Sequence, residues 1–279
     1  MSKIGTNGFE RRLEVLRQRY PDYKPYFDLY TKVILQRKKY KEQPQINPIS
    51  FSEEMAQFKL KGGFSVLGKE ALEIDLSHAQ GLFFFLCESL KEIPELKEKT
   101  EKIAFYFQKR PSELEMLLKD FLKEKSLPMT GDLDVGIRDF LVFHSIKPSI
   151  EANLEQIAPK IKDFSWSKGY CPVCGEHPFI AALRENGKRF AKCSLCGYEW
   201  QIERIFCPFC GNRDHQRIKY FEAEGEKEYR VYLCENCKAY LKTIDEREIE
   251  GEVDLELEDI VTVHLDVLAE RQGYKKMGV

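Results

Sequence analysis

The sequence contains no long apolar run. Its longest wholly apolar stretch is six residues, starting at Leu82, whereas a helix that spans a membrane needs about 20. Four arginines and a glutamate stand among residues 11–19, and they interrupt the apolar core that a signal peptide requires. We therefore expect a soluble protein that does not insert into membranes and that stays in the cytoplasm.

An excess of charge of either sign is also missing. The 44 lysines and arginines nearly balance 46 acidic residues, so no overall basic field favours nucleic acid. With 43% hydrophobic residues and only 12 prolines, wholesale disorder is excluded. Locally, the first fifty residues hold eleven basic and five acidic residues, whereas residues 245–259 hold one basic and nine acidic. We interpret both runs as solvated surface, with charge complementarity between the two ends of the chain, or toward a partner, as the alternative.

Catalytic motifs are absent as well. The sequence has no Gly-rich phosphate loop, no GxSxG and no HExxH. Its five histidines are scattered, and none stands beside an obvious carboxylate or nucleophile. We therefore predict that the protein is not an enzyme.

The first 163 residues are predicted to form an all-α domain. Apolar residues recur three or four positions apart in successive segments, which is typical of amphipathic helices. Ser77 is expected to cap one of these helices. Separate helices are expected at 132–144 and 150–161, whereas the prolines and glycines of residues 41–63 predict a poor helix.

What the sequence does contain is cysteine in an ordered pattern. Eight of the nine cysteines form four CxxC pairs, namely Cys171 with Cys174, Cys193 with Cys196, Cys207 with Cys210, and Cys234 with Cys237. In a reducing compartment such thiols persist as metal ligands rather than as disulfides. The gap of two residues lets both sulfurs of a tight turn face one ion, and two such turns supply a tetrahedral site. Eight sulfurs therefore predict two metal ions, each in a site of four cysteines.

The intervals between the pairs indicate which cysteines share an ion. Asn186-Gly187 lies between two short apolar runs in the first interval, which is a strong hairpin signal. The second interval repeats the plan with a turn at Gly225. Each hairpin should bring its own two pairs together, so we favour sequential pairing over a cross-braced arrangement. Only ten residues separate the second pair from the third, which predicts one rigid tandem of modules.

Glycine follows the second cysteine in three of the four pairs, where it suits a backbone position with positive φ. Lys238 takes that place in the fourth pair, which predicts a looser turn there. The ligands leave the metal open between iron and zinc, since both suit four thiolates. We favour a scaffold role over a redox role, because a closed site of four thiolates leaves no position free for substrate.

The sequence as a whole predicts an α+β protein, in which an N-terminal helical domain precedes a tandem of two rubredoxin-like or zinc-ribbon modules and a C-terminal helix. We assign 1–163 to the helical domain and 164–204 to the first metal module. The second metal module covers 205–245, and 246–279 form an acidic segment with the C-terminal helix.

The cysteine region resembles a known family. The resemblance rests on Gly-Tyr-Cys-Pro-Val-Cys-Gly at 169–175, Cys-Ser-Leu-Cys-Gly-Tyr-Glu-Trp at 193–200, Arg204 before Cys-Pro-Phe-Cys-Gly, and Tyr-Leu-Cys-Glu-Asn-Cys-Lys at 232–238. These segments resemble the FdhE family of formate dehydrogenase accessory proteins, over the last two-fifths of the chain. The resemblance implies a cytoplasmic protein whose eight paired cysteines hold two rubredoxin-like metal sites. It further implies a chaperone that binds the catalytic subunit of a membrane-bound molybdenum or tungsten formate dehydrogenase before twin-arginine export.

Two other functions stay open. Iron in such a site would suit a rubredoxin-like electron carrier. A nucleic-acid-binding zinc ribbon would use the basic residues around the first hairpin, which are Arg184, Lys188, Arg189 and Lys192. The isoelectric point near 6.3 argues against nucleic acid as the partner.

Overall fold

The computed structural model describes residues 6–41, 45–49, 52–123 and 131–277. The chain divides into two compact units. The sheet unit comprises Met1–Phe27, Glu54–Val66 and Asp163–Val279, and the helical unit comprises Asp28–Glu53 and Leu67–Lys162. The sheet unit thus includes the N-terminal helix as well as the cysteine region. The domain boundaries predicted from composition stay a prediction.

The helical unit is built from long helices, as expected. They are most of α2 (Lys24–Lys41), α4 (Leu76–Leu90), α5 (Pro94–Lys109), α6 (Pro111–Asp120) and α7 (Val135–Ile161), with short 3-10 turns at η2 (Lys69–Ala71) and η3 (Phe121–Lys123). Helix α4 packs against α5, α6 and α7. Phe83 and Phe107 meet edge to face with their ring centroids 5.5 Å apart, and both are fully buried. The apolar stripes read from the sequence therefore form the core of this unit.

Three local expectations are wrong. Helix α7 runs without interruption through Pro148, because Ile146 and Ile150 on either side are fully buried and their packing outweighs the hydrogen bond that proline removes. Helix α3 (Glu53–Lys61) forms within the stretch predicted to be a poor helix. Helix α4 is capped by Asp75, whose side chain accepts from the His78 N–H, and Ser77 lies inside the helix.

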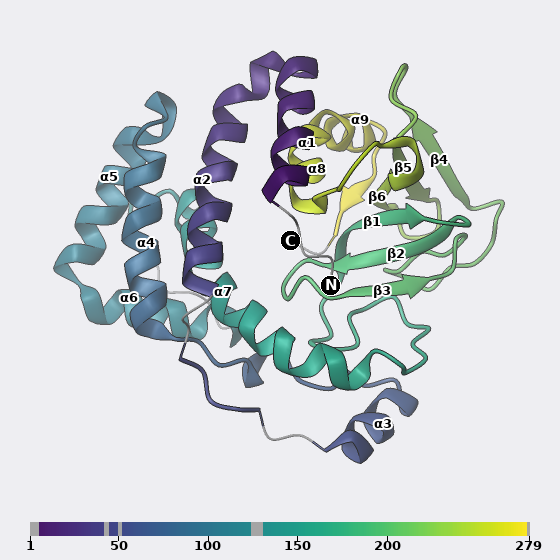
Figure 1. Ribbon diagram of the computed structural model, residues 1–279, viewed down its shortest axis with the longest axis horizontal. Coiled ribbons are helices and arrows are strands. Elements are labelled where there is room, and N and C mark those ends of the chain that lie inside the picture. Colours follow the sequence, from purple (N-terminus) through teal and green to yellow (C-terminus); the bar gives the residue numbers. More distant parts are fainter. Residues whose placement is uncertain (1–5, 42–44, 50–51, 124–130, 278–279) are drawn as a thin grey trace. The chain divides into compact units, whose positions relative to one another are not determined.

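The sheet unit contains one seven-stranded sheet with the order β3-β2-β1-β6-β5-β4, and with β7 beside β6 (Figure 1). The strands are β1 (Pro178–Arg184), β2 (Lys188–Cys193), β3 (Glu199–Ile202), β4 (Ile218–Glu222), β5 (Tyr229–Cys234), β6 (Ala239–Asp245) and β7 (Lys275–Lys276). The two predicted hairpins are present as β1–β2 and β4–β5. Strands β1 and β6 pair in parallel, and this pairing joins the two hairpins into a single sheet. The α+β class is confirmed.

Helices at both ends of the chain complete the sheet unit. Helices α8 (Leu255–Val261) and α9 (Val263–Arg271) replace the single C-terminal helix that was expected, and they pack against β1, β5 and β6. Helix α1 (Thr6–Arg19) is joined to α8 by Arg12, which donates to both carboxylate oxygens of Glu258 at 2.6 and 2.9 Å. Among the described residues, no helix has the length and apolarity needed to cross a bilayer.

The contact between Arg12 and Glu258 joins the basic segment 1–50 to the acidic segment 245–259. Both side chains are buried, at 8% and 0% exposure, and the Tyr229 hydroxyl also donates to Glu258 at 2.7 Å. The interpretation of both runs as solvated surface is therefore wrong for this pair. Charge complementarity between the two ends of the chain accounts for it.

Candidate metal centres

The four CxxC pairs share one backbone geometry. In each CxxC turn, the N–H of the residue after the second cysteine donates to the carbonyl of the first, over 2.9 to 3.2 Å. That residue has positive φ in all four turns: Gly175 at 81°, Gly197 at 76°, Gly211 at 75° and Lys238 at 58°. The turn folds the chain back so that both sulfurs of a pair face the same side.

The expectation of a looser fourth turn is wrong. Lys238 adopts the left-handed conformation that glycine adopts elsewhere, and its N–H donates to the Cys234 carbonyl at 2.9 Å. Its surroundings hold it in place, because its carbonyl accepts from the Lys275 N–H at 2.8 Å and its ammonium pairs with Glu235 and lies over the Tyr274 ring. These contacts offset the strain of a side chain at positive φ.

The first centre comprises Cys171, Cys174, Cys193 and Cys196, all buried. Its Sγ–Sγ distances include 3.6 Å between Cys171 and Cys196, 3.4 Å between Cys174 and Cys193, and 3.7 Å between Cys174 and Cys196. Backbone N–H groups of Val173 and Cys196 point at the sulfurs of Cys171 and Cys193, each over 3.4 Å. Such donors stabilise thiolates.

The second centre comprises Cys207, Cys210, Cys234 and Cys237. The sulfurs lie 3.7 Å apart for Cys207 and Cys237, and 3.7 Å apart for Cys210 and Cys234. Cys210 and Cys237 are exposed, whereas Cys207 and Cys234 are buried. The second centre therefore has one open edge, which distinguishes it from the first.

Two side-chain amides lie within donor distance of sulfurs of the second centre. Asn212 Nδ2 lies 3.7 Å from the sulfur of Cys234, and Asn236 Nδ2 lies 3.6 Å from that of Cys210. Burial acts to raise the pKa of Cys210, but the Asn212 backbone N–H and the Asn236 amide outweigh it and lower that pKa to about 7. This sulfur is thus prepared to be a thiolate near neutral pH, as a metal ligand must be.

In the first centre a thiolate is favoured in a different way. Burial raises the pKa of Cys171 and of Cys196. It also acts to raise that of Cys193, but hydrogen bonds from the three other thiols outweigh it and hold the pKa of Cys193 well below its usual value. One thiolate is therefore stabilised by its neighbours within a fully buried group.

Both groups fit a tetrahedral four-thiolate site. Sulfurs bound at about 2.3 Å to one ion would lie about 3.8 Å apart. Five of the Sγ–Sγ distances are 3.4 to 3.7 Å, and the four sulfurs of each group all lie within 4.8 Å of one another. The grouping is the sequential one expected from the hairpins. Each group could hold one metal ion. That the eight sulfurs are the ligands stays a prediction.

The two modules are packed directly against each other. Gly169 lies against the backbone of Pro208 in the third CxxC turn, and the His177 ring contacts Phe209 with the centroids 5.6 Å apart. His177 lies outside both groups of cysteines. Residues 54–66 in turn contact the first CxxC turn, since the Val66 N–H donates to the Pro172 carbonyl at 2.8 Å. The expected packing of the two modules against each other is thus present.

The basic residues around the first hairpin are largely occupied within the protein. Arg184 pairs with Glu199 and Glu246, at 2.6 and 2.8 Å. Arg189 is 1% exposed, and Lys192 lies 3.8 Å from Glu199. The burial of Arg189 could not be predicted from the alternation of residues along its strand, because residues of the second module cover the side chain. The structure therefore removes most of the basic surface on which a nucleic-acid interface would depend.

Comparisons with known proteins concern this same region. Residues 170–204 match the family model described as "FdhE, central domain", and residues 205–279 match that described as "FdhE, C-terminal domain". The boundary between the two matches falls between the second and third CxxC turns. Each matched domain thus contains one complete group of four cysteines.

Individual relatives and one solved structure agree. The chain is similar to a protein FdhE homolog of Aquifex aeolicus, at 26% identity over 95% of this chain and 91% of the relative. It is 31% identical to a homolog of Pseudomonas aeruginosa and 27% identical to FdhE of Escherichia coli, over 39% and 42% of this chain but only 37% and 38% of those proteins. The crystal structure of FdhE from Pseudomonas aeruginosa has the same fold, with a TM-score of 0.68, 19% identity and coverage of 100% of this chain and 96% of that one.

Proposed function

We propose that this chain, whose residues 170–279 match the central and C-terminal domains of FdhE and contain both groups of four cysteines, is an FdhE-type accessory protein in the maturation of a formate dehydrogenase. The proposed partner is the catalytic subunit of a membrane-bound molybdenum- or tungsten-dependent enzyme. Binding takes place in the cytoplasm, before that subunit leaves by the twin-arginine route. The protein acts by binding and not by catalysis.

The observation that supports this proposal is the coincidence of sequence family and site geometry. Clusters of cysteine pairs also occur in unrelated ribbons, so the match of residues 170–279 to the two FdhE domains is weighed together with the geometry of the cysteines. Here the motifs fold into two groups of four sulfurs that lie within 4.8 Å of one another, and the β1–β6 pairing joins their hairpins into one sheet. A rigid surface of this kind suits a module that binds a folded protein.

The cysteines of the two centres are proposed as the metal ligands, with iron or zinc as the ion. Bound metal would contribute to folding directly, since an unfolded chain offers no preformed site. Replacing Cys171 by Ser should therefore remove one ion per chain and unfold the first module, and Cys207→Ser should do the same for the second. Cys87→Ala is the matched control, because Cys87 is buried in α4 and lies outside both centres. A folded double variant that lacks metal would contradict the claim that bound metal is needed for folding, whereas a double variant that keeps both ions would contradict the ligand assignment.

The partner is tested by an anaerobic pull-down from the cell extract of the source organism, with the metal-loaded chain as bait. We expect capture of a molybdenum or tungsten formate dehydrogenase catalytic subunit, and loss of capture with the Cys171→Ser and Cys207→Ser double variant. Deletion of the gene should lower formate dehydrogenase activity. Unchanged activity after deletion would refute the proposed function, as would a metal-loaded bait that captures ribosomal or nucleic-acid partners instead.

One observation favours a second candidate function. The exposed sulfurs of Cys210 and Cys237 would give an iron ion in the second centre a short route to a redox partner, as in a rubredoxin-like electron carrier. Reversible one-electron reduction with turnover of a partner would support this function. Full biological activity of a protein loaded only with zinc would exclude it.

A further inference from the structure

Arg189 carries a positive charge in the interior of the sheet unit. It extends from β2 of the first module and is 1% exposed. Its Nη1 donates to the Phe206 carbonyl at 3.2 Å, and its Nη2 donates to the Thr243 hydroxyl at 3.0 Å. The guanidinium lies over the Tyr232 ring, with Cζ 4.1 Å from the centroid. Every one of these partners is neutral.

The absence of a carboxylate sets Arg189 apart from comparable residues. In the described part of the sheet unit, the other buried cations are Arg12 and Lys242. Arg12 pairs with Glu258, and Lys242 pairs with Asp259 and Asp266 at 2.7 Å each. Arg189 has no ion pair among the described residues, and its Nε has no hydrogen-bond partner. Because burying an uncompensated charge is energetically costly, a nearby anion is expected.

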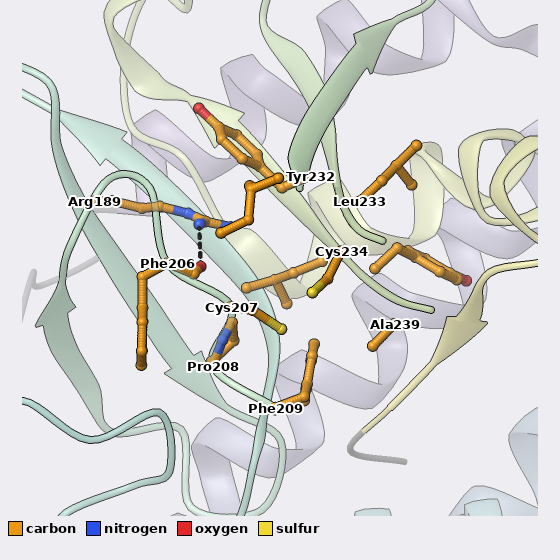
Figure 2. A pocket seen from close by; sticks show the side chains of 12 residues that line it. Arg189, Phe206, Cys207, Pro208, Phe209, Tyr232, Leu233, Cys234 and Ala239 are labelled. Atoms are coloured by element: carbon orange, nitrogen blue, oxygen red, sulfur yellow. Dashed lines mark hydrogen bonds between the residues drawn. The ribbon is translucent and has the colours of Figure 1, made fainter. Parts of the chain in front are cut away.

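The second centre lies where that anion is needed. Arg189 lines a cavity of about 10 Å³ together with Cys207 and Cys234, which is too small for any ligand larger than a water molecule. Figure 2 shows the guanidinium at the Phe206 carbonyl, directly before Cys207, with the sulfurs of Cys207 and Cys234 pointing toward each other. Burial lowers the pKa of Arg189 to about 10, while the charges of Tyr232 and Cys207 act in the opposite direction.

The expected net charge of the second centre gives a physical reason for a cation near it. Four thiolates around a divalent ion carry a net charge of −2. A buried guanidinium that lines the same cavity as Cys207 and Cys234 would stabilise that charge through a medium of low dielectric constant. We propose that Arg189, a residue of the first module, is the internal counter-charge of the second four-cysteine centre and thereby sets its metal affinity. This inference rests on the proposed role of the cysteines as ligands and is independent of the partner.

The test uses three variants of the full-length chain and measures zinc affinity at each centre separately. Arg189→Gln removes the charge but keeps an amide that can donate to the Phe206 carbonyl. Arg189→Lys keeps the charge. Arg184→Gln is the matched control, because Arg184 pairs with carboxylates and lies outside the cavity. Competition with a chelator, followed by thiol alkylation and mass spectrometry, assigns each lost ion to the cysteines that held it.

We expect Arg189→Gln to weaken zinc binding at the second centre by about tenfold or more, with the first centre unchanged. Arg189→Lys should restore most of the affinity, and Arg184→Gln should alter neither centre. With iron bound, Arg189→Gln should also lower the reduction potential of the second centre, because loss of the positive charge disfavours the more negative, reduced form.

Three outcomes would overturn the inference. The first is unchanged affinity at the second centre in a folded Arg189→Gln protein. The second is equal weakening of both centres, which would indicate a general loss of structure. The third is a folded Arg189→Lys protein that binds as weakly as Arg189→Gln. If the wild-type chain bound no metal, the ligand assignment itself would fall, whereas the partner proposal is tested separately by the pull-down.

Discussion

A Cβ atom placed on Gly169 would lie 1.9 Å from the carbonyl oxygen of Pro208. Gly169 stands just before the first CxxC turn in the sequence, and Pro208 lies inside the third. The backbones of the two metal modules therefore touch at a point that admits no side chain. This contact, together with the β1–β6 pairing, makes the two modules one body.

Gly169→Ala should lower the free energy of unfolding by about 3 kcal/mol, because one of the two backbones must shift. Gly211→Ala is the control, since its Cβ would meet nothing within 4 Å and it adds only the strain of positive φ, about 1 kcal/mol. Denaturant midpoints of the zinc-loaded proteins, at one zinc concentration, provide the comparison. Equal shifts for the two variants would show that the contact between modules is unimportant for stability.

The two centres should lose metal in a fixed order. Cys210 and Cys237 are exposed, whereas all four sulfurs of the first centre are buried, so a chelator reaches the second ion first. We expect alkylation of the second group of cysteines to precede that of the first by at least about tenfold in rate. Time-resolved alkylation with mass spectrometry measures the order. Simultaneous labelling of all eight cysteines would mean that metal release requires global unfolding.

Arg12→Met should destabilise the sheet unit by about 3 to 5 kcal/mol, because among the described residues it leaves the buried Glu258 carboxylate with the Tyr229 hydroxyl as its side-chain donor. Thermal or urea unfolding measures the loss. Lys102→Met serves as the control, since the Lys102–Glu98 pair at 2.7 Å is exposed and its loss should leave the unfolding midpoint unchanged. A comparable shift in both variants would contradict the role assigned to the buried pair.

Asp75 should make the helical unit sensitive to acid. Burial acts to raise the pKa of Asp75, but N–H groups of His78 and Gln45, which donate at 3.0 and 2.8 Å, outweigh it and lower that pKa below its usual value. Because the folded-state pKa lies below the unfolded one of about 3.9, the ionised side chain stabilises the fold above about pH 4. That contribution disappears as the pH falls through the folded-state pKa.

Asp75→Ala should therefore cost about 1 kcal/mol at pH 7, with the difference from wild type shrinking below about pH 4. Helix content followed by circular dichroism during urea unfolding, at several pH values, measures this dependence. Ser77→Ala is the control, because Ser77 lies inside α4 and is not its cap. A loss with Ser77→Ala as large as that with Asp75→Ala would reinstate the cap predicted from sequence.

The features that the sequence predicted are those set by neighbours along the chain. The Asn186-Gly187 turn closes a hairpin whose strands are adjacent in sequence, and the second hairpin closes in the same way around Gly225. Each hairpin fixes which cysteines meet, so the sequential grouping followed from spacing alone. The resemblance to the FdhE family rests on the same local segments.

Local pattern was insufficient where burial or distant partners decide the outcome. Lys238 indicated a looser turn, but β7 and Tyr274, which arrive from the end of the chain, hold it in the glycine conformation. Separate helices were expected at 132–144 and 150–161, but the buried residues on either side of Pro148 keep α7 continuous. In both cases the free energy of packing exceeds the local preference.

The sequence by itself thus determined the two hairpins, the two groups of four cysteines and the resemblance of residues 170–279 to the FdhE domains. Only the tertiary structure decided that Arg12 meets Glu258 across 246 positions, that β1 pairs with β6, and that Arg189 of one module lines the same small cavity as Cys207 and Cys234 of the other. The physical reason is that turns and short hairpins depend on local conformational preferences. The burial of a charge or the joining of two hairpins into one sheet depends on which distant segments are brought together, and the local sequence pattern does not encode that.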